Sequence, residues 1–292
     1  MRGFELLEPS TLDEAVTLLD REDESIRAIA GGTALMLMMK ARLFQPTRLV
    51  SLRRVNGPVK SISLGKDGAL RIGAMTPLQQ MESSGDIARA FPVMTRTLHT
   101  LSNIRIRNVA TLGGHLAHGD PHMDLPPVLV TLGARVRAVS PRGQRWIPVE
   151  ELIVGYYQTA LERDELIAEV EIPAQPDGVH AWYEKFTALS ADDWPAVGVA
   201  VWYRIASGVI AEARVAISSA TERPMRSPGA ESVLAKARPT TEIFMNASDA
   251  AAAEVQPLAD IRGTVAYKRE MIRVHVRRAL QNALQTDHKE GK

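Results

Sequence analysis

The chain has 292 residues, enough for two domains, and its 45% hydrophobic and 24% charged residues are ordinary for a soluble globular protein. Its 35 basic and 34 acidic residues leave a net charge of +1, which shows no bias toward nucleic acid or another polyanion. It contains no cysteine, which excludes disulfides, thiolate metal sites and any iron–sulfur cluster held by this chain.

The N-terminus predicts neither export nor a membrane anchor. Residues 1–9 carry two acidic side chains and no long apolar core, unlike a signal peptide. The sequence has no run of roughly eighteen apolar residues, the length that crosses a membrane. We therefore expect a cytoplasmic protein without a transmembrane segment.

The first fifty or so residues have the pattern of a small βαβ-type lobe. Thr11-Leu-Asp-Glu14 is a capping box that predicts the start of a helix. A short apolar run from Ile26 ends at Gly31-Gly32, and residues 33–43 read as a second helix. Residues 49–52 predict another short strand, so the order is strand, Gly-Gly turn, helix and strand.

The pattern changes at about residue 57. Alternating apolar residues on either side of a Gly65–Gly68 turn predict a β-hairpin over residues 62–72. Thr76-Pro-Leu-Gln79 predicts a helix with Thr76 as its N-cap, and residues 91–101 predict another. The clearest strand is Leu166–Ile172, where every second residue is apolar.

Gln175-Pro-Asp-Gly178 is the best domain boundary by turn chemistry. Beyond it the sequence predicts strands over residues 181–186, 197–205 and 213–218, and helices over 231–237, 243–255 and from about 263 onward. An α/β region followed by strands and then helices indicates the α+β class. We predict domains 1–177 (lobes of about 1–56 and 57–177) and 178–287, followed by a polar tail, 288–292.

Two Gly-Gly turns are the candidates for a ligand site: Ala30–Leu35 and the longer stretch Ala110–Asp124. Glycine lets the backbone approach a ligand closely, and free amide groups at such turns favour phosphate, although a single turn of this kind is often plain chain geometry. Arg105 and Arg107 precede the second turn and are candidates to bind a phosphate or a partner. Neither turn matches the P-loop or the Gly-x-Gly-x-x-Gly pattern, so no Rossmann site is predicted.

These segments resemble a known family. Ala30–Leu35 followed by Met39-Lys40, and Ile106–Pro121 ending in Asp124, resemble the two FAD-binding segments of the molybdenum hydroxylase flavoproteins. The resemblance is closest to the medium subunit of carbon monoxide dehydrogenase-type enzymes, which is related to the xanthine dehydrogenase FAD-binding subunit. It continues through residues 148–161, 166–173 and 185–194, and so covers most of the chain.

This resemblance implies a two-lobed vanillyl-alcohol-oxidase-like (PCMH-type) FAD-binding domain followed by a C-terminal flavoprotein domain. The chain would be an electron-transfer subunit in which the flavin carries the chemistry and no side chain is catalytic. It would accept electrons from [2Fe–2S] clusters on a small subunit, next to a molybdopterin-bearing large subunit, in a dimer of heterotrimers. The acceptor would be a quinone, NAD⁺, oxygen or another oxidant. The absence of cysteine agrees with that division of labour.

The resemblance also implies which residues hold FAD. The pyrophosphate would lie on the backbone of Ala30, Gly31, Gly32, Thr33, Ala34 and Leu35 and on that of Thr111, Gly113 and Gly114. Asp124 would meet the adenosine ribose, and Leu101 and Ile167 would line the cofactor. Lys185 would lie near the pyrimidine edge of the flavin, where a cation raises its potential, and Trp194 near the isoalloxazine ring.

Two alternatives start from His115, where the family usually has asparagine. In the first, the chain is a non-catalytic structural subunit whose flavin site has degenerated. In the second, His115, His118, Asp120, His122 and Asp124 bind zinc or iron. Histidines three residues apart share a metal only on a helix, and the neighbouring Gly-Gly and Asp-Pro predict a loop. We therefore expect this run, His115 included, to supply polar contacts to the flavin and no metal site.

Overall fold

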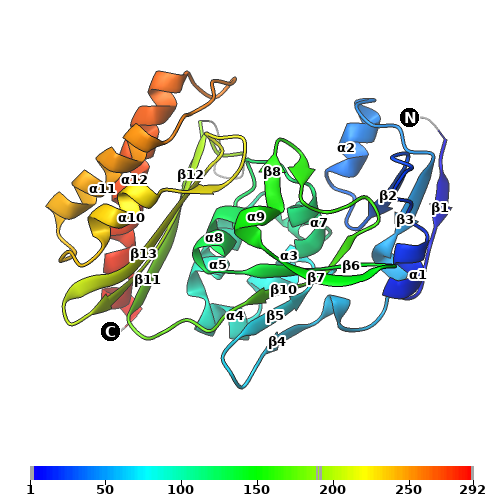
Figure 1. Ribbon diagram of the computed structural model, residues 1–292, viewed down its shortest axis with the longest axis horizontal. Coiled ribbons are helices and arrows are strands. Elements are labelled where there is room, and N and C mark those ends of the chain that lie inside the picture. Colours follow the sequence, from blue (N-terminus) through cyan, green and yellow to red (C-terminus); the bar gives the residue numbers. More distant parts are fainter. Residues whose placement is uncertain (1–2, 189, 191–192, 291–292) are drawn as a thin grey trace.

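The computed structural model describes residues 3–188, 190 and 193–290, without the side chains of 286–290. Leu189, Ala191 and Asp192 of the predicted cofactor segment, and residues 291–292 of the predicted tail, lie outside the described residues. Three bodies follow one another along the longest axis: a small N-terminal lobe, a central lobe and a C-terminal sheet covered by helices (Figure 1). The predicted α+β class is confirmed.

The N-terminal lobe is a parallel three-stranded sheet in the order β1-β3-β2. Its elements are β1 (Glu5–Leu7), α1 (Leu12–Thr17), β2 (Ile26–Ile29), α2 (Leu35–Lys40), β3 (Arg48–Ser51) and the 3-10 turns Leu52–Arg54 and Pro58–Lys60. Thr11 caps α1, as predicted, because its hydroxyl accepts from the amide of Glu14 at 3.1 Å. The Glu14 carboxylate accepts from the amide of Ser10, one residue earlier than a capping box requires.

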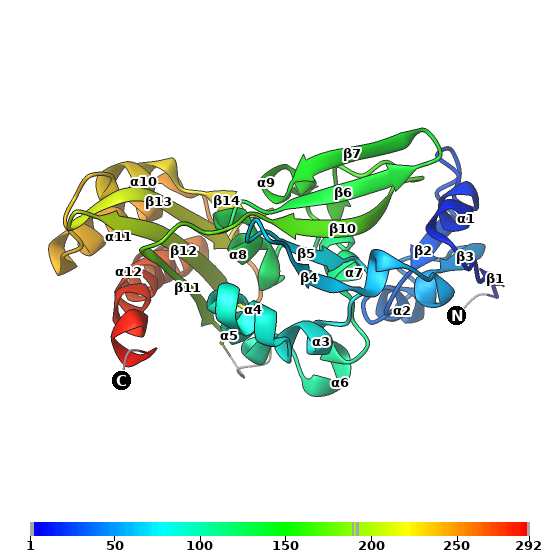
Figure 2. The ribbon, with the colours of Figure 1, turned by 90° about the horizontal axis from the view of Figure 1, so that it is seen from below.

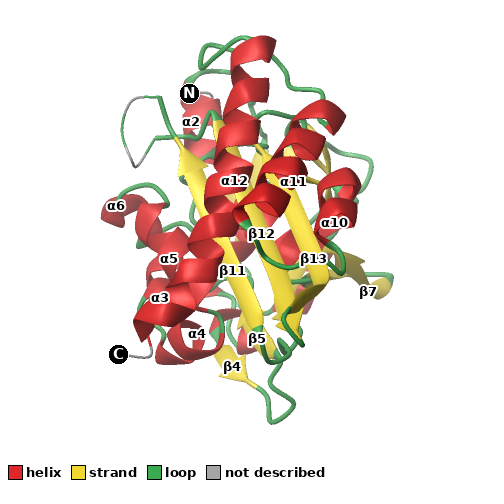
Figure 3. Ribbon diagram, turned by 90° about the vertical axis from the view of Figure 1, so that its left-hand side faces the viewer, coloured by secondary structure: helices red, strands yellow, loops and turns green. Residues whose placement is uncertain are grey.

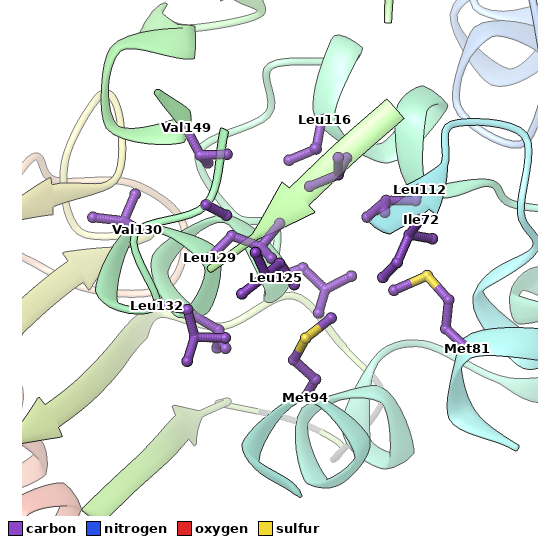
Figure 4. Packing of buried hydrophobic residues seen from close by; sticks show 14 of the residues in the cluster. Ile72, Met81, Met94, Leu112, Leu116, Leu125, Leu129, Val130, Leu132 and Val149 are labelled. Carbon is purple, nitrogen blue, oxygen red and sulfur yellow. The ribbon is translucent and has the colours of Figure 1, made fainter. Parts of the chain in front are cut away.

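The central lobe is an antiparallel sheet in the order β4-β5-β10-β6-β7, with helices packed beneath it (Figure 2). Its strands are β4 (Ile62–Leu64), β5 (Leu70–Gly73), β6 (Arg135–Ser140), β7 (Gly143–Pro148) and β10 (Leu166–Ile172), with a small hairpin of β8 (Ile153–Gly155) and β9 (Gln158–Thr159). Its helices are α3 (Leu78–Glu82), α4 (Gly85–Ala90), α5 (Pro92–Thr100), α6 (Ile104–Arg107), α7 (Leu112–Ala117), α8 (Leu125–Thr131) and α9 (Val149–Leu152). Leu112 and Leu116 of α7 share one core with Ile72 and Met81 (Figure 4).

Two local expectations in this lobe are wrong. Thr76 is not an N-cap: α3 begins at Leu78 with Pro77 as its cap residue, while the buried Thr76 hydroxyl points to the carbonyl of Ser61 at 3.4 Å. The stretch from Leu112 to Ala117 is helical and not a loop, so the first part of the His/Asp run lies on α7. At Thr76 a tertiary hydrogen bond decides the side-chain position, and it is not encoded in local sequence patterns. By contrast, α7 begins at a local cap, because the Thr111 hydroxyl accepts from the amide of Gly114 at 3.2 Å.

The C-terminal sheet is antiparallel, in the order β11-β12-β13-β14. It is formed by β11 (Val179–Phe186), β12 (Val197–Ala206), β13 (Val209–Ser218) and β14 (Met225–Arg226), followed by α10 (Pro228–Leu234), α11 (Thr241–Glu254) and α12 (Val265–Glu290). These three helices cover the outer face of the sheet (Figure 3). The helical backbone of α12 continues through Glu290, past the start of the predicted polar tail.

Strand β12 is buried on both faces. Val199, Val201 and Tyr203 pack in the core beneath the three helices, whereas Ala200 and Trp202 belong to the core of the central lobe. Trp202 is 1% exposed, and its indole donates to Gln175 at 2.8 Å. The C-terminal sheet therefore packs on the central lobe through a shared hydrophobic core. No helix of the described residues is long and apolar enough to cross a membrane.

Because this core is shared, we predict that Trp202→Ala lowers the free energy of unfolding of the whole chain by about 3–5 kcal/mol. Denaturant unfolding followed by far-UV circular dichroism should keep a single transition that moves to lower denaturant. Trp146→Ala is the matched control, because Trp146 is 37% exposed and should change stability by about 1 kcal/mol or less. Two separate transitions, of which only one responds to Trp202→Ala, would contradict a shared core.

Candidate functional site

The two Gly-Gly turns meet face to face. A Cβ atom on Gly31 would lie 2.2 Å from the carbonyl oxygen of Val109 and 2.9 Å from Cα of Ala110. A Cβ on Gly114 would lie 3.4 Å from that of Ala30. Gly32 has φ +73°, a conformation that favours glycine. Gly31 is therefore required by the contact between the N-terminal and central lobes, and Gly32 by its own backbone conformation.

The backbone amides of the two turns differ in what they donate to. In the second turn Leu112 donates to the carbonyl of Thr76 at 3.1 Å, Gly113 to Ala74 at 2.7 Å, and Gly114 to the Thr111 hydroxyl at 3.2 Å. In the first turn the amides of Gly31, Gly32 and Thr33 have no acceptor among the described residues. Amides of this kind need a partner from outside the chain, whereas those of the second turn already have one.

One cavity of about 690 Å³ extends from this contact to the C-terminal sheet. It is lined by every residue that the sequence predicts to bind the cofactor: Ala30, Gly31, Gly32, Thr33, Ala34, Leu35, Leu101, Thr111, Gly113, Gly114, His115, Asp124, Ile167, Lys185 and Trp194. The volume is that of a site for a sizeable organic ligand. The lining residues come from both lobes and from β11, so the cavity exists only in the folded whole.

Sequence reasoning missed several lining residues, among them Arg27, Phe44, Met75, Ser102, Tyr157 and Arg163. They lie on segments that carry no motif and reach the cavity only through the packing of the lobes. Met75 is buried among core residues of the N-terminal lobe, although it follows a strand of the central lobe. A contact of this kind has no signal in a single sequence.

His115 places an unpartnered polar atom in the cavity wall. The side chain lies on α7 and is 8% exposed, and its Nε2 has no hydrogen-bond partner among the described residues. Burial lowers its pKa to about 4, with a smaller contribution from His118, so the imidazole is neutral at pH 7. A neutral imidazole can donate or accept one hydrogen bond to a ligand.

Asp124 and Lys185 form a buried ion pair in the wall of the cavity. Lys185 Nζ lies 3.1 Å from Asp124 Oδ2 and donates to the carbonyl of Thr100 at 2.8 Å. The Tyr183 hydroxyl donates to Asp124 Oδ1 at 2.8 Å. Burial raises the pKa of Asp124, and Lys185 and Tyr183 only partly offset that increase. These contacts join the loop after α7 to β11, on which both donors lie.

Arg107 is not available to bind a phosphate. Its guanidinium is buried against Glu82, with Nε 2.7 Å from Oε2, and donates to the carbonyls of Leu101 at 3.1 Å and Ser102 at 2.8 Å. Ser102 has φ +51°, so these donations stabilise an unusual backbone in the cavity wall. Arg105 is exposed and does not line the cavity. The proposed phosphate role of Arg107 is therefore replaced by a structural one.

The His/Asp run does not converge on one point. His118 is the C-cap of α7, and His122 Nδ1 is bonded to Asp120 at 2.8 Å. Within residues 3–188, 190 and 193–290, no group of three or more His, Asp or Glu side chains is placed to hold a metal ion. His115 and His118 are thus spaced three residues apart on a helix, but no third side chain of the described residues joins them as a metal ligand.

Free amide donors, a buried ion pair and largely apolar walls in one cavity suit an extended dinucleotide cofactor. The unpartnered His115 Nε2 and the open amides of Gly31–Thr33 are groups that such a ligand would satisfy. The site therefore has the features of a dinucleotide-binding cleft of non-Rossmann type, built from two lobes and a C-terminal sheet.

Comparison with known proteins gives the same class. The FAD binding domain in molybdopterin dehydrogenase matches residues 2–175, and the CO dehydrogenase flavoprotein C-terminal domain matches residues 182–283. The carbon monoxide dehydrogenase medium chain of Hydrogenophaga pseudoflava is 32% identical over 280 residues, which is 96% of each chain. The nicotine 6-hydroxylase medium subunit of Paenarthrobacter nicotinovorans is 34% identical over 276 residues, 94% of this chain and 95% of that one.

Solved structures agree with this match. The carbon monoxide dehydrogenase of Hydrogenophaga pseudoflava that lacks the Mo-pyranopterin moiety of its molybdenum cofactor has a TM-score of 0.93 at 32% identity, over 97% of this chain and 98% of that one. This chain belongs to the family of FAD-binding medium subunits of the molybdenum hydroxylases, whose members serve multi-subunit oxidoreductases. The resemblance seen in the sequence is confirmed, and FAD is the cofactor of the family.

We predict that Gly31→Ala abolishes or strongly weakens FAD binding. The added methyl group meets the rigid backbone of Val109, so the two turns must separate or the chain loses at least about 1–3 kcal/mol of stability. FAD titration by fluorescence and thermal unfolding measure both effects. Gly85→Ala is the control, since nothing lies within 4 Å of its Cβ position. Normal FAD affinity and stability in Gly31→Ala would refute the contact.

We predict a stability loss in mild acid that depends on His115. Its folded pKa of about 4 lies below the ordinary 6.5, so the unfolded chain takes up the proton first. The contribution of neutral His115 to the free energy of unfolding is therefore constant above about pH 6.5. It decreases as the pH falls toward 4, by about 3 kcal/mol at most. His115→Asn, which does not titrate, should lose less stability over this range in urea unfolding of the FAD-free chain. If the free energy of unfolding of wild type and of His115→Asn changed with pH in parallel, the prediction would be wrong.

Proposed function

We infer that this chain carries electrons through FAD from iron–sulfur clusters on a partner subunit to an external acceptor, in a complex whose substrate is oxidised at a molybdopterin-bearing subunit. The observation that carries the proposal is the cavity itself, which joins open amide donors, a buried ion pair and a half-exposed aromatic side chain, Trp194. The chain has no cysteine and so needs a partner for the clusters.

The residues present fit FAD. Amides of Gly31, Gly32 and Thr33 would bind the negatively charged diphosphate, and His115 Nε2 would add one hydrogen bond. FAD supplies the redox chemistry, because it exchanges electrons singly or in pairs. The second turn, whose amides are occupied, would act as the rigid support against which the first turn is held.

Asp124 and Lys185 are better assigned to one part of the cofactor than to two. An extended FAD separates its adenosine ribose from its flavin by far more than the 3.1 Å that joins these side chains. Lys185 and Trp194 line the same cavity, so we place Asp124 with them at the flavin. There the Lys185 ammonium, fixed by Asp124 and Thr100, would offset negative charge added to the cofactor on reduction.

We further propose a dimer of heterotrimers with a large and a small partner subunit in the cytoplasm. The relatives include medium subunits of a carbon monoxide dehydrogenase and a nicotine 6-hydroxylase, so similarity to them does not single out one substrate. A purely structural subunit with a degenerate site fits less well, because the cavity and its open donors are intact. A His/Asp metalloprotein lacks a converging ligand set among the described residues.

The test uses the complex that co-purifies with the tagged full-length chain. We expect stoichiometric FAD, iron and molybdenum, and transfer of electrons from the photochemically reduced complex to a quinone analogue, NAD⁺ or oxygen. A complex reversibly depleted of FAD should keep its reduced iron–sulfur signal in electron paramagnetic resonance but lose transfer to that acceptor. FAD added back is the control. Equal transfer without FAD, or zinc or iron bound by the isolated chain in place of flavin, would overturn the proposal.

A further inference from the structure

A tight turn of the C-terminal domain lies next to Trp194, a residue that lines the cavity. Asp260 and Gly263 exchange two backbone hydrogen bonds, of 3.1 and 3.2 Å, which close the turn just before α12. The amide of Arg262 donates to the Asp260 side chain at 2.8 Å. Lys268, 1% exposed on α12, reaches the same carboxylate at 3.0 Å. The turn is thus a rigid part of the C-terminal domain.

The Asp260 carboxylate contacts two groups that in turn lie against the indole of Trp194. Its Oδ2 lies 3.5 Å from His122 Nε2 and 3.7 Å from Arg262 Nη1. The imidazole of His122 stacks on Trp194 with ring centroids 6.2 Å apart and planes at 26°. The Arg262 guanidinium lies over the same indole, 5.6 Å from the ring centroid. Such cation–π contacts are attractive within about 6 Å.

The two groups that lie against the indole are linked through Asp260. His122 and Arg262 approach the same carboxylate oxygen, so the two groups lie near each other. His122 cannot easily move, because its Nδ1 and its amide both bond to Asp120 Oδ1, at 2.8 and 2.9 Å. Trp194 is 48% exposed and lines the cavity. A side chain this exposed would otherwise sample several rotamers, so the neighbouring groups decide which face it presents.

We propose that Asp260 is a positioning residue that, through His122 and Arg262, fixes the indole of Trp194 at the cofactor cavity. The proposal rests on the proposed flavin site, because the indole is fixed for contact with FAD. It makes the C-terminal domain part of the flavin environment through the turn at 260–263 as well as through β11. Neither Asp260 nor Arg262 lines the cavity, so both act through Trp194.

The test labels the four tryptophans of the full chain with 5-fluorotryptophan and follows the Trp194 resonance by ¹⁹F NMR, assigned by its loss in Trp194→Ala. Arg262→Gln removes the guanidinium but leaves the Asp260–Lys268 pair intact. We expect its Trp194 resonance to move toward that of a freely rotating tryptophan, FAD affinity to fall about two- to fivefold, and flavin emission to rise. In wild type, added FAD should shift this resonance.

A matched control and a second variant separate positioning from folding. Arg273→Gln is the matched control, because it also replaces an arginine by glutamine, in an exposed ion pair with Asp249 outside the cavity. It should leave the Trp194 resonance and the affinity for FAD unchanged. Asp260→Asn should reproduce the Arg262→Gln shift, although Lys268 then loses its partner and stability falls. In a Trp194→Ala background, Arg262→Gln should change FAD affinity no further.

An unchanged Trp194 resonance in both Arg262→Gln and Asp260→Asn would overturn the proposal. So would a Trp194 resonance that ignores FAD while the flavin binds normally, because the indole would then not face the cofactor. If no variant and not even the wild type binds FAD, the proposed function fails instead. The resonance shift of the FAD-free chain still tests the contact between Asp260 and Trp194 in that case.

Discussion

The structure depends on a contact between two glycine-containing turns from different lobes. Gly31 approaches the backbone of Val109 so closely that no side chain fits, and Ala30 packs beside Gly114. This contact brings the open amides of the first turn into the wall of the cavity that Asp124 and Lys185 also line. Both lobes contribute to the one binding site through this contact.

The two turns are similar in sequence but differ in how their backbone amides are hydrogen-bonded. The second turn uses its amides internally, on Ala74, Thr76 and Thr111, and therefore serves as a fixed support. The first turn leaves its amides open and is the part that can bind an anion. The C-terminal domain adds the Asp124 partners from β11 and, by our proposal, the turn at Asp260 that fixes Trp194. Binding and electrostatic tuning are thus contributed by different parts of the chain.

Much of this could be predicted from the sequence because local patterns determine it. Alternating residues predicted β10 and the β4–β5 hairpin, and the paired Gly-Gly segments identified residues that all line one cavity. The helical start of the His/Asp run was misread although its cap, Thr111, lies in the local sequence. Thr76 and Arg107 were misread, because distant carbonyls and Glu82 decide their conformations. The Asp260 turn was missed for the same reason: it meets Trp194 only through tertiary packing.

By our proposal, the first turn binds the cofactor and the second turn supports it. Hydrogen–deuterium exchange of the full chain, with and without FAD, tests this most directly, because exchange reports whether an amide has an acceptor. We expect FAD to slow exchange strongly at Gly31, Gly32 and Thr33, whereas Leu112, Gly113 and Gly114 are already protected and should change little. Unchanged exchange at residues 31–33, with new protection confined to residues 112–114, would contradict it.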